Sequence, residues 1–346
     1  MLRHVTLLCF LFLCGYTPRS LAQKNVLIGY AVGYPFRVIQ KYVDSFLRYT
    51  TELDDVVIFS SLESVDVTKF ARPDNVKVMK VLVQQGNNKN SHYKRFGDIH
   101  KFLSSTTEAY DKVITTDVRD VMFQDNPFEQ IEHSKGVMVF CEPDLLRNNP
   151  WNVDWVSAWY GREVVDRLVA NNFTVINVGI IMGNFNDMLS YFSLFSRELT
   201  RLLEAAKRAD TPKTASAFSG IDTAVHYDVM LVQLPAENVS TTIVDAGKGR
   251  SCHRQKLPLH RDATGRLLND HQEVFAILHQ LDRKNSEHLW FHYLRYGDLL
   301  YRRARHGGTH PLRKTSAKRD KSRKNMTKAM PLGNMVPATP RRASPL

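Results

Sequence analysis

The sequence has few cysteines, no internal repeat and, once its C-terminal end is set aside, no net charge. Only four of its 346 residues are cysteine, and two of these lie near the N-terminus. Cys141 and Cys252 are the remaining pair that an oxidising compartment could join, although a sequence alone does not show whether two cysteines meet. A small fold stapled by several disulfides is therefore excluded.

The formal charge of +12 belongs to the C-terminal end of the chain. From Arg302 onward lie thirteen of the 47 lysines and arginines and one of the 35 acidic residues, which leaves 34 of each in residues 1–301. Nucleic-acid binding is not expected, because it needs a basic face on a folded module. Residues 302–346 are expected to form a disordered basic tail, which either stays solvated or contacts anionic membranes or glycans.

The N-terminus lacks an apolar run long enough to span a bilayer. Its apolar stretch extends from Val5 to Tyr16, follows basic residues and is followed by a small residue, Ala22, suited to cleavage. We expect a signal peptide over residues 1–22, with a short uncleaved signal anchor as the alternative. This predicts a protein of the secretory pathway (ER or Golgi lumen) or a secreted protein. Glycosylation sequons at Asn172, Asn238 and Asn325 agree weakly with it.

Strand-like apolar runs alternate with helical patterns between the two ends. Strands are predicted at residues 25–33, 54–61, 75–83, 111–116, 136–143, 173–183, 241–247 and 273–280. Helices are predicted at residues 37–50, 92–106, 186–208, 219–234 and 287–301. This order predicts an α/β fold with a mainly parallel sheet and helices on both faces, as one large domain or two small packed ones.

Two aspartates follow one of these strands directly. The stretch 111–131 reads DKVITTDVRDVMFQDNPFEQI and places Asp117 and Asp120 at the strand's carboxyl end. Ligands bind open parallel sheets at that edge, and two carboxylates at this spacing can hold one hard divalent cation. Such a cation suits a diphosphate leaving group, because it neutralises charge on the departing oxygens. The structural alternative is that Asp117 caps the turn while Asp120 pairs with Arg119.

The segment ITTDVRDVMFQDNPFE resembles the strand-end motif of GT-A-fold glycosyltransferases that have Asp-x-Arg-Asp followed by Phe-Gln and Pro-Phe. The glycosyltransferase domain of the lysyl hydroxylases has a comparable spacing of two aspartates. NVGIIMG (177–183), GIDTAVHYDVML (220–231) and ILHQLDR (277–283) resemble later motifs of the family, in its order. The resemblance implies a GT-A-like (Rossmann-like) domain over residues 23–301 that transfers a hexose from a nucleotide-diphosphate sugar.

Carried over residue by residue, the resemblance implies that Asp117 and Asp120 bind a divalent ion, with manganese expected. His279 would be the third ligand, with a purely structural histidine as the alternative. The expected donor is a UDP-sugar, and the expected acceptor is a hydroxyl of a glycan, glycoprotein or lipid.

The resemblance also implies residues that contact the donor. Ala31, Val32 and Gly33 would hold the base and ribose, since glycine allows close approach of the backbone. Arg95 would reach the diphosphate or be a solvated helix charge, and Arg119 would lie near the phosphates or brace the aspartates. Asp222 would be the catalytic or orienting acid, or an acid favoured in the first turn of a helix.

The chain departs from the family's pattern at three positions. Thr223 replaces the Gln after the helix Asp, Tyr227 replaces an Asn, and Val178 replaces a Ser. We expect these changes on the sugar and acceptor side, where they leave donor choice and turnover open. Their presence motivates one rival, a nucleotide- or glycan-binding protein of the same fold without catalysis.

A second rival is a metal-dependent phosphoesterase, since paired aspartates can also activate water. The chain shows no second group of His and Asp ligands of the kind that two-metal hydrolases use. Elsewhere, Trp151, Trp155 and Trp159 recur every four residues. On a helix they would form one stripe, which is either packed core or a platform for an acceptor sugar.

Overall fold

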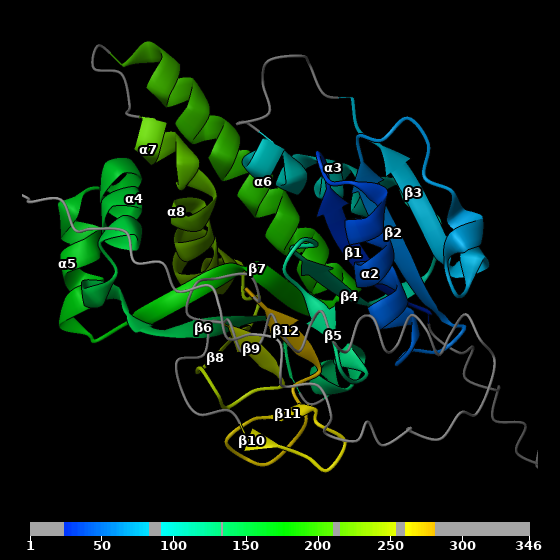
Figure 1. Ribbon diagram of the computed structural model, residues 1–346. Helices are drawn as coiled ribbons and strands as arrows, with labels where there is room; N and C mark the ends of the chain where they lie inside the picture. The colour runs from blue at the N-terminus through cyan, green and yellow to red at the C-terminus, as the bar shows by residue number, and fades with distance from the viewer. Residues whose placement is uncertain (1–23, 83–90, 133, 210–214, 254–259, 281–346) are drawn as a thin grey trace, which may run out of the picture. The chain divides into compact units, whose positions relative to one another are not determined.

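A computed structural model describes residues 24–82, 91–132, 134–209, 215–253 and 260–280 (Figure 1). The signal peptide expected at residues 1–22, the helix expected at 287–301 and the tail expected at 302–346 lie outside the described residues. All described residues belong to one unit, Met1–Arg305.

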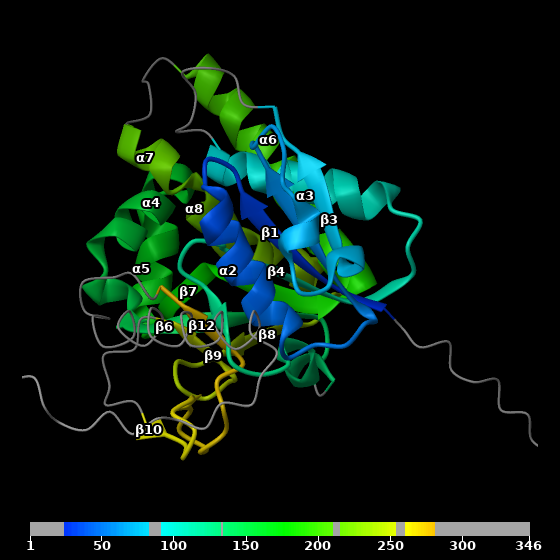
Figure 2. The same cartoon turned by 45° about the vertical axis from the view of Figure 1, so that its right-hand side comes forward.

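A seven-stranded sheet occupies the centre of this unit, with strand order β3-β2-β1-β4-β7-β6-β8 (Figures 1 and 2). The four strands at one side, β3, β2, β1 and β4, are parallel, and β8 is parallel to β6. The strands are β1 Lys24–Ala31, β2 Asp54–Ser60, β3 Val76–Lys80, β4 Tyr110–Thr116, β6 Val137–Leu145, β7 Thr174–Asn184 and β8 Thr241–Val244.

Strand β7 runs antiparallel to both of its neighbours, β4 and β6, which the prediction of a mainly parallel sheet did not anticipate. Helices α4 and α5 connect β6 to β7, and β7 begins at the same end of the sheet at which β6 finishes. The backbone N–H of Leu146, just after β6, donates to the carbonyl of Phe173, just before β7, at 2.8 Å. The α/β class and the large sheet are confirmed, and the sheet is mixed but mostly parallel.

Helices cover both faces of the sheet because the strands alternate apolar side chains between two cores. Val26 and Ile28 of β1 face the core beneath α3 and α6, whereas Leu27 faces the core beneath α2. All three side chains are fully buried, and each such side chain contributes roughly 1.5–3 kcal/mol on burial. These helices are α2 Phe36–Leu47, α3 Ser91–Ser105 and α6 Phe185–Arg208.

Of the remaining helices, α8 and α9 pack against α6, whereas α4 and α7 pack against α8, and α5 packs against α4. Gly161, with φ of 89°, separates α4 from α5, because few other residues adopt this backbone conformation. The helix predicted from Gly220 is present and passes into a π-helical turn, Val229–Gln233. The bounds are α4 Pro150–Tyr160, α5 Arg162–Ala170, α7 Ala215–Ser219, α8 Ile221–Asp228 and α9 Leu234–Ala236, and the short 3-10 turns are Val67–Lys69, Pro73–Asn75, Pro127–Ile131 and Leu146–Asn148.

Two small sheets accompany the main one, and Figure 1 shows β10 and β11 at the bottom of the view. The first has the order β5-β12-β9, and the second pairs β10 with β11. Their strands are β5 Met122–Phe123, β9 Ser251–His253, β10 His260–Arg261, β11 Leu267–Leu268 and β12 Ile277–His279. Except for β12, which falls inside a predicted strand, these were not predicted, since two or three residues show no periodicity.

Cys141 and Cys252 are both buried thiols rather than a disulfide. The hydroxyl of Thr174 donates to Sγ of Cys141 at 2.9 Å, and burial raises the pKa of that thiol. The sequence did not show whether these two cysteines form a disulfide, and in the structure they do not.

Candidate metal centre

The candidate site lies where the parallel strands β1 and β4 end. Asp117 and Asp120 follow β4 in one tight turn, and the Asp117 N–H donates to the carbonyl of Gly179 in β7 at 2.9 Å. Asp120 is 3% exposed, whereas the Asp117 side chain is 36% exposed. The turn is thus fastened to the antiparallel neighbour and presents one open and one buried carboxylate.

A bulge in β7 shapes the floor of the site. Ile181 pairs with Val139 of β6, but the next β6 residue, Phe140, pairs with Asn177, so the register slips around Gly179. Bulges of this kind re-aim side chains beside functional sites. A Cβ added at Gly179 would lie 2.3 Å from Cε1 of His279 and 2.8 Å from Oδ2 of Asp117. Only glycine fits beneath these two side chains.

His279 ends strand β12 and completes a group of three ligands. Its Nε2 lies 3.2 Å from Oδ2 of Asp117 and 3.8 Å from Oδ1 of Asp120. One potential ligand atom from each residue lies within 4.8 Å of the other two. Neighbouring ligands of an octahedral ion bound at about 2.1 Å are about 3 Å apart, so this arrangement fits a divalent ion. The three residues could therefore hold a metal, as the sequence predicts.

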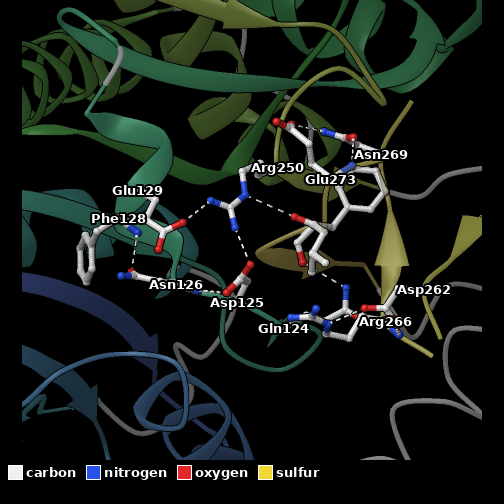
Figure 3. A network of polar contacts seen from close by, with 12 residues as sticks. Gln124, Asp125, Asn126, Phe128, Glu129, Arg250, Asp262, Arg266, Asn269 and Glu273 are labelled. Carbon is white, nitrogen blue, oxygen red and sulfur yellow. Dashed lines mark hydrogen bonds and ion pairs between the residues drawn. The ribbon is translucent and has the colours of Figure 1, made fainter. Parts of the chain in front are cut away.

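A polar network around Arg250 holds β12 in place (Figure 3). Arg250 donates to Asp125 at 2.6 Å, to Glu129 at 2.7 Å and, through Nε, to the carbonyl of Val274 at 3.3 Å. Gln124 also donates, at 3.0 Å, to the carbonyl of Phe275. These bonds join the segment after β5 to the segment that enters β12. They set the position of His279 relative to the two aspartates.

Arg95 of α3 links the metal cluster to Asp222. Its guanidinium donates to Oδ1 of Asp117 at 2.5 Å and to Oδ2 of Asp222 at 3.4 Å. Burial opposes the charged form of Arg95, but Asp117 and Asp222 outweigh it and raise the pKa of the guanidinium. Burial likewise opposes ionisation of Asp117, but Arg95 and then His279 outweigh it and lower the pKa of that carboxyl. Arg95, whose side chain is 13% exposed, is thus a largely enclosed cation within the site, rather than the solvated helix charge that was the alternative.

The pKa of His279 is raised. Burial disfavours the imidazolium, but the hydrogen bond to Asp117 and the charge of Asp120 outweigh that effect. Asp222 is 8% exposed and lies in the first turn of α8, where an acidic residue is favoured. It also accepts a hydrogen bond from Arg95, which places it beside the metal cluster.

The loop after β1 lies at the same edge of the sheet. Ala31 is fully buried, backbone included, while Gly33 is exposed with φ of 83° and donates its N–H to Ser61 Oγ at 2.9 Å. Val32 between them is partly buried. Tyr34 follows, and burial together with the charge of Asp117 raises the pKa of its phenol. The structure therefore places this loop near the cluster.

Arg119 is the most exposed of the charged residues predicted for the site. Its side chain is 48% exposed, and its guanidinium lies 4.0 Å from Oδ2 of Asp120. This contact matches the bracing alternative, and the exposure leaves the guanidinium accessible to an anion.

A buried carboxylate that the sequence analysis missed supports the site from behind. Glu142 in β6, 7% exposed, accepts from Asn177 at 2.8 Å and from Gln280 at 3.0 Å. Asn177 in turn accepts from the N–H of Gly179 at 2.7 Å. The sequence signal that could have identified Glu142 is its position as an acidic residue inside the apolar run GVMVFCEP. Glu142 ties β6, β7 and the end of β12 together.

The departures from the family's pattern lie in different places. Tyr227 is 2% exposed, and its hydroxyl accepts the N–H of Ile176 in β7 at 3.0 Å. Its side chain therefore anchors α8 in the core, contrary to the expectation that it faces a sugar. Thr223 is 8% exposed and adjoins Asp222, whose Oδ1 accepts the Thr223 N–H at 2.9 Å. Val178 is partly buried in the β7 bulge.

The tryptophan stripe on α4 is partly packed and partly open. Trp159 donates from its ring to the carbonyl of Ala217 at 2.8 Å, and Trp155 lies directly against Gly220, where a Cβ would meet its ring at 2.0 Å. Trp151 is 63% exposed, and its ring centroid lies 6.4 Å from that of Trp155. Trp159 thus packs against α7, Trp155 packs against the start of α8, and Trp151 is open.

No protein-family model matches the chain, and no curated protein matches its sequence. Among the described helices, none combines the length and apolar character needed to cross a membrane. A function for this chain is therefore argued from the geometry of the site.

Proposed function

We propose that this protein is a GT-A-fold glycosyltransferase that uses a divalent metal. It transfers a hexose from a nucleotide-diphosphate sugar, most simply a UDP-sugar, to a hydroxyl of a glycan, glycoprotein or lipid. The observation that carries the proposal is the convergence of Asp117, Asp120 and His279 at the carboxyl edge of β1 and β4. Open α/β sheets bind nucleotides at that edge.

The donor set supports manganese as the ion. Two carboxylates favour Mg²⁺, Ca²⁺ or Mn²⁺, and the added imidazole favours a transition metal over the first two. Bound to Asp117, Asp120 and His279, the ion would supply positive charge for a departing diphosphate. Arg95 and Arg119 would add fixed positive charge beside it. A site that collects cations around two carboxylates fits a donor whose diphosphate leaving group gains negative charge as it departs.

The remaining residues take positioning roles in this proposal. In the loop Ala31, Val32 and Gly33, the accessible residues Val32 and Gly33 would hold the base and ribose, with Ala31 buried behind them. Asp222, fixed by Arg95, would orient the reacting sugar or the acceptor hydroxyl. The exposed ring of Trp151 would stack on an acceptor sugar. Each role requires a ligand at the carboxyl edge of the sheet.

We place the reaction in the lumen of the secretory pathway. The N-terminal segment motivates this location. The sequon residues Asn172 and Asn238 are both exposed, in turns with φ of 52° and 59°, which is where a glycan can be accommodated. The tail would then be a luminal basic segment able to contact anionic membranes or glycans.

The test is nucleotide release by the mature chain, residues 23–346, from a panel of UDP- and GDP-sugars, with manganese and with chelator. Asp117→Asn and Asp120→Asn should abolish metal-dependent release. Asp166→Asn, a change at an exposed carboxylate of α5, should not. Binding of UDP without turnover of any donor in the presence of candidate acceptors would favour the binding-protein rival, and release of phosphate from simple phosphoesters the phosphoesterase.

A further inference from the structure

A second histidine stands directly behind the candidate metal ligand. His253 ends β9 and is the register partner of His279 in the parallel strand β12. Because register partners project to the same face of a sheet, the two imidazoles meet. Their Nδ1 atoms are 2.9 Å apart, and the ring planes are inclined by 81°.

Two neutral imidazoles at this distance must share one proton between their Nδ1 atoms. When His279 carries it, the proton of His253 sits on Nε2 of His253, and Nε2 of His279 has a free lone pair directed at the carboxylates. When His253 carries it, the proton of His279 sits on Nε2, only 3.2 Å from Asp117, and blocks that nitrogen as a ligand. The direction of one hydrogen bond therefore decides whether His279 can bind a metal.

The surroundings hold His253 in place for this bond. His253 is 1% exposed, and its ring lies against Phe140, with centroids 5.9 Å apart. Its Nε2 contacts no hydrogen-bonding group among the described residues. Nδ1 is thus the nitrogen through which His253 acts, and its partner is the ligand His279.

We propose that His253 is a positioning residue for the metal centre. Its Nδ1 accepts the Nδ1–H of His279, which fixes the tautomer and aims Nε2 of His279 at Asp117 and Asp120. Metal-bound histidines are commonly oriented in this way by a carboxylate or a backbone carbonyl, and here an imidazole takes that place. The inference rests on the metal site of the proposed function and is independent of which sugar is transferred.

Two isosteric substitutions separate positioning from packing. His253→Asn places a side-chain oxygen near the position of Nδ1, whereas His253→Gln places it near Nε2, away from His279. The readout is the Mn²⁺ dissociation constant of the mature chain without nucleotide, followed by the paramagnetic resonance of free Mn²⁺. Circular dichroism and thermal unfolding in chelator report the fold.

We expect His253→Gln to weaken Mn²⁺ binding about 10–100-fold and His253→Asn to stay close to the wild type. His226→Gln is the matched control, since His226 is a fully buried histidine whose Nδ1 bonds to Tyr191 at 2.7 Å, outside the metal cluster. It should lower stability and leave Mn²⁺ affinity unchanged.

Equal affinities in the wild type and both His253 variants would overturn the inference, as would equal losses in both variants that follow their loss of stability. A wild type that binds no Mn²⁺ overturns both this inference and the metal site of the proposed function. If the His253 variants show the expected Mn²⁺ affinities but the wild type turns over no nucleotide sugar, the inference stands and the proposed function is refuted.

Discussion

The substitution Gly179→Ala is the sharpest perturbation of the candidate site. The added Cβ would stand 2.3 Å from Cε1 of His279, which is about 1.2 Å closer than the shortest comfortable contact of about 3.5 Å between carbons. It would also stand 2.8 Å from Oδ2 of Asp117. Metal–ligand distances tolerate about 0.2 Å, so a shift of this size removes His279, Asp117 or both from the ion.

We expect Gly179→Ala to weaken Mn²⁺ binding by at least about 100-fold, which is more than the usual effect of removing a group that hydrogen-bonds to a metal ligand. Crowding in the bulge should also cost about 1–3 kcal/mol of stability. Calorimetric titration with Mn²⁺ and thermal unfolding in chelator measure the two effects separately.

Gly97→Ala is the matched control for this prediction. Gly97 lies in α3, and a Cβ there meets nothing within 4 Å. This variant should gain roughly 0.5–1 kcal/mol, because alanine is the better helix former, and it should bind Mn²⁺ normally. A folded Gly179→Ala protein that binds Mn²⁺ as tightly as Gly97→Ala would refute the reasoning.

Three further predictions concern the framework around the site. Burial lowers the pKa of His226 to about 3, below the 6.5 expected when unfolded, so the unfolded state takes up the proton first and stability falls as pH drops below 6.5. By pH 5 the share of His226 in this loss is about 2 kcal/mol, and chemical denaturation should show a loss smaller by that amount in His226→Gln than in the wild type, because His253, whose pKa burial also lowers, contributes in both proteins. Tyr227→Phe leaves the buried N–H of Ile176 without its acceptor and should cost about 1–3 kcal/mol in denaturation experiments; a changed Mn²⁺ affinity would contradict its place in the core. Arg250→Gln removes the cation from its two carboxylate partners and should cost about 1.5–3 kcal/mol, with faster amide hydrogen exchange in β9 and β12; unchanged exchange there would show that the network does not hold these strands.

The elements that the sequence predicts well are those with long periodic patterns. Strands β1, β2, β4 and β7 and helix α6 appear close to their expected bounds, because each has a continuous apolar run or a long amphipathic face. The direction of β7 was not predictable in this way. It follows from a paired-helix connection whose geometry depends on Gly161 and on tertiary packing.

The candidate site shows the same division. Asp117 and Asp120 carry a local signal, since both stand at the end of one strand. His279 comes 162 residues after Asp117, and its approach depends on side chains such as Arg250 and Gln124 that fix the register of two- and three-residue strands. No periodicity encodes such contacts. His253 was missed for that reason, whereas Glu142 carried a local signal, an acidic residue inside an apolar run, that was not used. Tyr227 was assigned to the wrong environment.

The measurement that tests the central claim most directly is the affinity of the mature chain for UDP, with and without Mn²⁺, in the wild type and in Asp120→Asn. The account predicts that UDP binds the wild type tightly only when Mn²⁺ is present and that Asp120→Asn abolishes this dependence. UDP binding that is indifferent to Mn²⁺ and to the substitution, or the absence of any UDP binding, would contradict it.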